Sequence, residues 1–255
     1  MRNLLTNIGK KSKKAFLKKL SSNKKDKVLK DYYLLITKNK KLIINENKKD
    51  IKNAYKKKIK DNLIQRLILN NKKILEITNS IKKIIRLKDP TNIVLEKWKR
   101  PNGLVISKVS IPLGVIGIIY ESRPNVTADV ASLCFKSGNT VILKGGSEAY
   151  YSNLILSKLF RKSLKKNDVD ENFVQFLSIK KRSVVDFLLT KMSKFIDVII
   201  PRGGKSLVKK VQKLSSIPTI GHLEGVCHSY IDKSANAKIA NKIIQNAKLR
   251  NTAIC

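Results

Sequence analysis

Apolar positions in the first third of the chain recur at the three- and four-residue spacing of helices. Two sets each fall on one helical face: Val28, Leu29, Tyr32, Leu35 and Ile36, and Ile74, Ile77, Ile81, Ile84 and Ile85. The basic segment over residues 1–20 also places its apolar side chains on one face, which is typical of a helix docked on a core. Asp89 and Pro90 end the pattern, because a residue before proline disfavours helical backbone. Residues 1–90 are therefore predicted to form an N-terminal helical layer.

Two β-prone runs follow, IVLEKW and LVISKVS, and the turn RPNG separates them. Asn102 and Gly103 tolerate the positive φ angles that tight hairpin turns require. The pattern predicts a protruding β-hairpin within residues 91–110.

From residue 111 onward, short apolar runs alternate with helical patterns. Strands are predicted over residues 115–120, 140–143, 174–177, 198–200 and 227–231. Helices are predicted over residues 126–135, 151–164, 184–192, 206–214 and 237–247. Such alternation indicates an α/β domain, here residues 111–255, with a parallel sheet and helices on both faces. Ligands of such sheets bind at the carboxyl ends of the strands.

The formal net charge is +37, which ordinarily favours nucleic acid or an anionic membrane as partner. Only nine of the 55 basic residues are arginine, whereas lysine, asparagine and isoleucine are abundant. An A/T-rich genome gives this composition to any protein. The lysines are also scattered, and the sequence holds no helix-turn-helix, zinc-finger or RNA-recognition signature. The charge therefore indicates no specific nucleic-acid partner.

The cysteines are Cys134, Cys227 and Cys255, an odd number at wide spacing without a C-x-x-C pair. This pattern disfavours a disulfide framework and a metal site, and it favours the reducing cytoplasm. We expect both Cys134 and Cys227 to lie in the core. The most apolar run, residues 111–120, is far shorter than the ~20 residues of a membrane-spanning helix. The sequence therefore predicts no membrane association.

Asn125 lies in the turn ESRPN, between a predicted strand and a predicted helix. An asparagine at such a bend can donate its amide hydrogens to a developing oxyanion. Spacing alone favours a turn or helix N-cap asparagine, and the oxyanion interpretation stays open beside it.

Two further strand ends carry glycine pairs. In VILKGGSEA, Gly145 and Gly146 let the backbone approach a ligand, and Lys144 offers a cation. In DVIIPRGGKSLVKKV, the triplet Arg202-Gly203-Gly204 lies between a strand and a helix N-terminus, which is a natural phosphate site. Neither segment matches G-x-G-x-x-G or the Walker pattern, so a standard dinucleotide fingerprint is not supported.

Taken in order, these segments resemble gamma-glutamyl phosphate reductase, a proline-biosynthesis family of the aldehyde dehydrogenase superfamily. ESRPNVT, PRGG and the segment from HLEGVCH to the terminal Cys255 carry the resemblance. It implies an aldehyde-dehydrogenase-like, Rossmann-like α/β fold. It also implies an NADPH-dependent reductase that converts L-glutamyl 5-phosphate to L-glutamate 5-semialdehyde and phosphate. It further implies a homo-oligomer that pairs through the hairpin.

The resemblance also assigns roles. Asn125 matches the oxyanion asparagine, and Cys255 matches the nucleophile. The expected NADP(H) contacts are Lys144, Gly145, Gly146, Ser147, Arg202, Gly203 and Gly204. A cysteine suits an acyl phosphate, because a thiolate displaces phosphate and is later a good leaving group. No metal site is expected, and the roles of His222, Glu224 and His228 stay open.

Family members continue past the cysteine into a catalytic domain. The expectation from sequence is therefore that this domain is absent after Cys255 and that the chain is a truncated or split form. An inactive remnant and a basic nucleic-acid-binding module on a dinucleotide-binding fold are the alternative interpretations.

Overall fold

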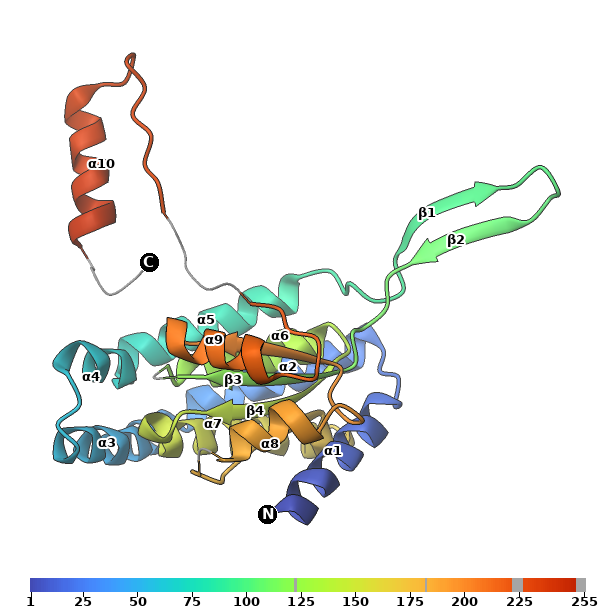
Figure 1. The fold of residues 1–255 in the computed structure, drawn as a ribbon, viewed down its shortest axis with the longest axis horizontal. Helices are drawn as coiled ribbons and strands as arrows, with labels where there is room; N and C mark the ends of the chain where they lie inside the picture. The colour runs from blue at the N-terminus through green and yellow to red at the C-terminus, as the bar shows by residue number, and fades with distance from the viewer. Residues whose placement is uncertain (122, 182, 222–226, 251–255) are drawn as a thin grey trace. The chain divides into compact units, whose positions relative to one another are not determined.

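The computed structural model describes all residues except 122, 182, 222–226 and 251–255 (Figure 1). The chain divides into two compact units, Met1–Gly221 and His222–Cys255. The first unit contains the sheet, the hairpin and nine of the α-helices among the described residues. The second contains α10 (Ala237–Leu249), whose N-terminus is capped by the side chain of Asn236.

The sheet has four parallel strands in the order β5-β4-β3-β6. The strands are β3 (Val115–Tyr120), β4 (Thr140–Gly145), β5 (Val174–Phe176) and β6 (Val198–Arg202). These runs are rich in Val and Ile, and β3 and β4 are buried along their whole length, as expected for strands covered on both faces. The predicted parallel sheet is confirmed.

Side chains of β3 alternate between two cores. Ile116, Ile118 and Tyr120 face a core shared with α6 (Asn125–Lys136) and α7 (Tyr150–Lys166). Val115 and Ile119 face a second core on the opposite side of the sheet. That second core is built by α1 (Arg2–Phe16), α8 (Ser183–Lys191) and α9 (Lys205–Leu214).

Four N-terminal helices form the predicted helical part of the first unit. They are α2 (Ser22–Lys38), α3 (Lys40–Lys56), α4 (Asp61–Leu67) and α5 (Asn71–Arg86). Helix α2 packs against α5 and α7, α3 packs against α7, and α5 packs against α6. They therefore form an outer helical layer on the α6 and α7 side of the sheet (Figure 1).

The predicted hairpin is present as β1 (Val94–Lys99) paired antiparallel with β2 (Val105–Val109). Gly103, in the turn of the hairpin, has a φ of +84°, a backbone conformation that glycine adopts more easily than other residues. The hairpin projects from the first unit (Figure 1) and carries exposed apolar side chains: Ile93, Val94, Leu95, Trp98, Leu104, Val105 and Val109.

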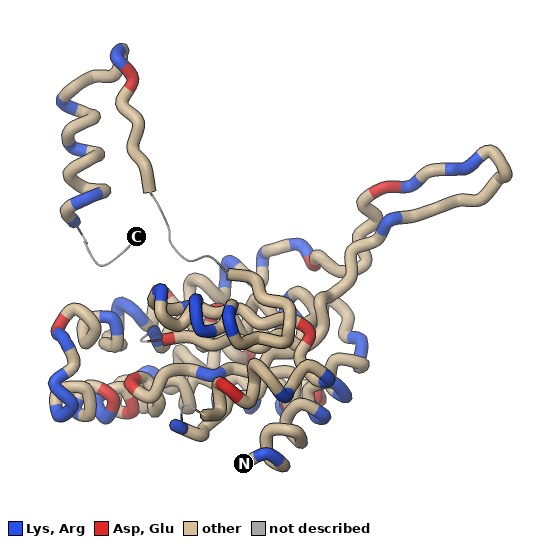
Figure 2. The backbone as a smooth tube through the Cα atoms, viewed as in Figure 1, with Lys and Arg blue, Asp and Glu red and all other residues tan. Residues whose placement is uncertain are grey.

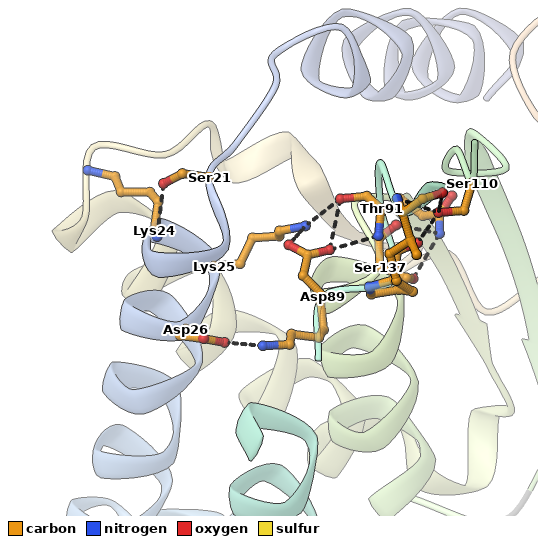
Figure 3. Close-up of polar contacts among 12 residues, drawn as sticks. Ser21, Lys24, Lys25, Asp26, Asp89, Thr91, Ser110 and Ser137 are labelled. Carbon is orange, nitrogen blue, oxygen red and sulfur yellow. Dashed lines mark hydrogen bonds and ion pairs between the residues drawn. The ribbon is translucent and has the colours of Figure 1, made fainter. Parts of the chain in front are cut away.

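Ion pairs fix the root of the hairpin (Figure 3). Lys25 of α2 is 1% exposed and pairs with Asp89 at 2.5 Å. Asp89 also accepts hydrogen bonds from the backbone N–H and hydroxyl of Thr91, just before β1. The next residue of α2, Asp26, pairs with the buried Lys136 at the end of α6. The hairpin thus starts from a point held by α2, which the second ion pair fixes to α6.

The strand predicted over residues 227–231 is wrong, and so is the expected burial of Cys227. These residues are exposed and outside any strand. Among the described residues of the second unit no strand exists with which this backbone could pair. Among the described residues, the chain that follows β6 adds one isolated parallel bridge to the sheet, from Thr219 to Ile199 of β6.

Basic residues are distributed along the helices and the hairpin of the first unit, and they recur in α10 (Figure 2). No described helix is long and apolar enough to cross a membrane.

Candidate functional site

Three predicted site turns begin side by side at the carboxyl edge of the sheet. The register pairs Tyr120, the last residue of β3, with Gly145 of β4 and with Arg202 of β6. The backbone N–H of Glu121 continues this pairing by donating to the carbonyl of Arg202 at 3.1 Å. The sheet topology therefore brings ESRPN, KGGSE and PRGGK together, although they are far apart in sequence.

Asn125 is the first residue of α6 and is half-buried. The N-cap of this helix is Pro124, so the interpretation of Asn125 as the N-cap is wrong. Its Nδ2 donates to Oδ2 of Asp129 at 3.2 Å, one turn along the helix. Burial raises the pKa of Asp129, although hydrogen bonds from Ser80 and Asn125 oppose that rise. The Asn125 amide is thus oriented by the first turn of α6.

Lys144 is 7% exposed, and its Nζ donates to the carbonyl of Gly145 at 2.9 Å. Burial lowers its pKa, while the negative charge of Glu148 opposes that effect. Ser147 is exposed and begins a 3-10 turn, Ser147–Ala149, that leads into α7. A Cβ on Gly146 would lie 2.1 Å from Oε1 of Glu148, so the Glu148 carboxylate lies against this turn.

Gly145 is explained by internal packing. A Cβ there would lie 2.3 Å from Nδ2 of Asn153 and 3.0 Å from the Tyr120 ring. The Tyr120 hydroxyl shares a hydrogen bond with Thr127 at 2.7 Å, and Thr127 donates to Asn153 at 2.9 Å. All three side chains are buried, so a side chain on Gly145 would disrupt a buried polar network.

Arg202, Gly203 and Gly204 are exposed between β6 and α9, and Gly204 is the N-cap of α9. The N–H of Gly204 donates to Oε2 of Glu121 at 3.0 Å. A Cβ on Gly203 would lie 2.5 Å from the same oxygen and 2.8 Å from Cδ2 of Leu207. The expected phosphate position therefore already faces a carboxylate of the chain itself.

Glu121 was missed by reasoning from sequence, and so was Asp50 of α3. Asp50 is 1% exposed and accepts from the N–H groups of Tyr151 and Ser152 at 3.0 and 2.8 Å, and from the Ser152 hydroxyl at 2.7 Å. Burial raises the pKa of Asp50, and these hydrogen bonds oppose the rise. Asp50 thus caps α7 directly behind the Ser147 turn.

The donors at this edge suit a dinucleotide phosphate. Backbone N–H groups at the N-terminus of a helix attract anions, and the one at Gly204 already binds a carboxylate. Gly203 and Gly204 add no side chain at this helix end, and Lys144 lies near the carboxyl end of β4, with β3 between β4 and β6. No described group of His, Cys, Asp and Glu residues is arranged to hold a metal ion.

The cysteines differ in accessibility. Cys255, the expected nucleophile, lies outside the described residues, as do His222 and Glu224. His228 is described and exposed. Cys134 is buried as predicted, and burial raises its pKa to about 12. A thiol with that pKa is almost fully protonated near neutral pH and is a poor nucleophile.

Iodoacetamide is therefore expected to alkylate Cys227 and to leave Cys134 unmodified in the native protein at pH 8. The reason is that Cys227 is exposed, whereas Cys134 is both enclosed and protonated. Peptide mass spectrometry measures the result, and the urea-unfolded protein, in which both react, is the control. Equal labelling of both residues in the native state would contradict the described burial.

The comparisons with known proteins support this fold. No protein-family model matches the chain. Gamma-glutamyl phosphate reductase from Bartonella tribocorum is 47% identical over 193 residues, which cover 76% of this chain and 47% of that protein. The crystal structure of the Thermotoga maritima gamma-glutamyl phosphate reductase matches with a TM-score of 0.91 and 36% identity, over 98% of this chain and 61% of that one. The chain belongs to the gamma-glutamyl phosphate reductase family.

Membership of the gamma-glutamyl phosphate reductases confirms the resemblance inferred from ESRPNVT and PRGG. The yeast enzyme of the same name matches with a TM-score of 0.78 and 32% identity, over 96% of this chain and 62% of that one. An acetylating aldehyde dehydrogenase from Geobacillus thermoglucosidasius, at 19% identity and a TM-score of 0.72, shares the fold. The chain spans about half the length of the curated reductases that it matches.

Proposed function

We propose that this chain provides the cofactor-binding part of an NADPH-dependent reductase that converts L-glutamyl 5-phosphate to L-glutamate 5-semialdehyde and phosphate in proline biosynthesis. The names of its relatives support the reaction. The observation that carries the proposal is the meeting of three site turns at the carboxyl edge of the sheet, where Gly204 binds an anionic group.

The cofactor contacts divide between two turns. Arg202, Gly203 and Gly204 hold the pyrophosphate at the N-terminus of α9, because that end of a helix carries a partial positive charge. The adenosine side lies by the turn that contains Lys144, Gly145, Gly146 and Ser147. When bound, NADPH supplies hydride to the carbonyl carbon of the acyl group.

The chain's own chemistry requires a nucleophile and an oxyanion donor. The Cys255 thiolate attacks the acyl carbon of glutamyl phosphate, a carbon–sulfur bond forms, and phosphate leaves with the electron pair of the broken carbon–oxygen bond. Nδ2 of Asn125 donates to the oxyanion that forms during this attack. Its present acceptor, Asp129, keeps the amide oriented at the start of α6.

We further propose three functional segments: residues 1–90 as the helical part of the cofactor-binding domain, 91–110 as an oligomerisation hairpin and 111–255 as the dinucleotide-binding α/β domain. The exposed apolar hairpin supports a homo-oligomer, because unpaired strand edges of this kind invite a second chain. The cysteine usage supports a cytoplasmic location.

Cofactor binding provides the direct test. NADPH is expected to bind the 255-residue chain, and Gly203→Val should weaken binding about tenfold or more, a loss of about 1.4 kcal/mol. The added side chain would occupy space beside Glu121 and Leu207 that the phosphate must enter. Fluorescence titration of NADPH measures both affinities.

Gly103→Asn, at the exposed hairpin turn, is the matched control, because asparagine tolerates the positive φ there. This variant should bind NADPH as the unaltered chain does. Circular dichroism establishes that Gly203→Val is folded. Undiminished NADPH binding by folded Gly203→Val would argue against the pyrophosphate position, and no binding to the unaltered chain would argue against the proposed function.

A further inference from the structure

Helix α9 lacks a cap of its own. Its N-cap residue is Gly204, which has no side chain, and its first turn contains no acidic residue. The first N–H groups of a helix have no partner within the helix, and they are normally satisfied by a nearby Ser, Thr, Asp or Asn. The cap must therefore come from elsewhere in the fold.

Glu121 provides it from the end of β3. Its Oε2 accepts the Gly204 N–H at 3.0 Å across a separation of 83 residues. The backbone N–H of Glu121 is fixed to the carbonyl of Arg202, so its side chain starts beside the glycine turn. The carboxylate is exposed and lies so close to Gly203 that any side chain there would touch it.

We propose that the Glu121 carboxylate is an internal stand-in for the cofactor phosphate, which occupies the anion position of α9 in the free protein and is displaced when the cofactor binds. This inference rests on the proposed function, in which the pyrophosphate binds at the same turn. A phosphate at the same N–H group would lie a few ångströms from the Glu121 carboxylate, and like charges at that distance repel. Glu121 therefore weakens cofactor affinity, and it accepts the hydrogen bond of the Gly204 N–H when the cofactor has left.

Glu121→Gln tests this directly. The variant keeps the shape and one acceptor oxygen but removes the charge. NADPH should bind it about fivefold more tightly than the unaltered chain at low salt, because a charged helix cap is worth up to about that factor. Inorganic pyrophosphate, as a second probe, should show the same gain. Both gains should shrink as ionic strength rises, because the carboxylate is exposed.

Glu171→Gln is the control for net charge. Glu171 lies just before β5, which is the outer strand on the side of the sheet away from β6. It should bind both probes as the unaltered chain does. Isothermal titration calorimetry measures the affinities, and circular dichroism confirms folding. Equal or weaker binding of pyrophosphate to Glu121→Gln would overturn the inference, and so would no pyrophosphate binding to either protein. If pyrophosphate binding improves but NADPH binds to neither, the inference about the anion position stands and the proposed function fails.

Discussion

Replacement of Lys25 by alanine is expected to lower the free energy of unfolding by about 3 kcal/mol. The Lys25 side chain is 2% exposed and that of Asp89 is 16% exposed, so the variant leaves a carboxylate largely removed from water without its cation. Breaking a buried pair on one side costs more than the pair itself contributes, because the remaining charge has lost solvent and partner. Urea denaturation followed by circular dichroism measures the change.

The matched control is Lys108→Ala. Lys108 lies 3.9 Å from Glu96 on the hairpin, and both side chains are exposed, so its loss should cost less than about 1 kcal/mol. The double variant Lys25→Met/Asp89→Asn should recover much of the lost stability, because it removes both charges and keeps an acceptor for Thr91. Equal effects of Lys25→Ala and Lys108→Ala would contradict the importance of burial at the hairpin root.

The effect of Lys25→Ala should also depend on pH. Burial alone would raise the pKa of Asp89, but hydrogen bonds from Lys25 and Thr91 bring it below its ordinary value. A carboxyl whose pKa is lower when folded stabilises the protein above its unfolded pKa of about 3.9, and that contribution is lost as pH falls. The difference between the unaltered chain and Lys25→Ala should therefore be largest near pH 7 and smaller near pH 3, where protonated Asp89 no longer needs a cation.

Elements with a clear local pattern could be predicted from the sequence. The apolar run of residues 115–120 gave strand β3 with the observed bounds, and Asn102-Gly103 placed the hairpin turn. The order of strands and helices then placed KGGSE and PRGGK at one edge, because the carboxyl ends of parallel strands meet there. These features depend on nearest neighbours in sequence or on the handedness of α/β units.

Contacts between distant residues could not be predicted in this way. Asp50 reaches the start of α7 across 101 residues, and Glu121 reaches Gly204 across 83. Each carboxylate is far in sequence from the helix that it caps, so capping rules based on neighbouring residues do not identify it. The prediction of a strand over residues 227–231 failed for a related reason. A short run of β-prone residues forms a strand only when another strand lies beside it, and the described residues of the second unit contain no strand.

Loss of the Cys255 thiol is expected to lower turnover by roughly 10⁴-fold or more, because removal of a nucleophile abolishes the covalent route. The chain spans about half the length of its curated relatives, so the test joins residues 1–255 to the remaining C-terminal part of a gamma-glutamyl phosphate reductase such as that of Thermotoga maritima. The assay follows NADPH formation from glutamate 5-semialdehyde, phosphate and NADP.

The joined protein should turn over, and Cys255→Ala within it should not, while still binding NADPH. Cys227→Ala is the control, because Cys227 is an exposed thiol that is not among the proposed site residues, and its loss should leave the rate unchanged. Cys134 cannot replace the nucleophile, because burial raises its pKa to about 12 and keeps it protonated. Turnover that survives Cys255→Ala but is lost in Cys227→Ala would move the nucleophile to Cys227 and refute the assignment of Cys255.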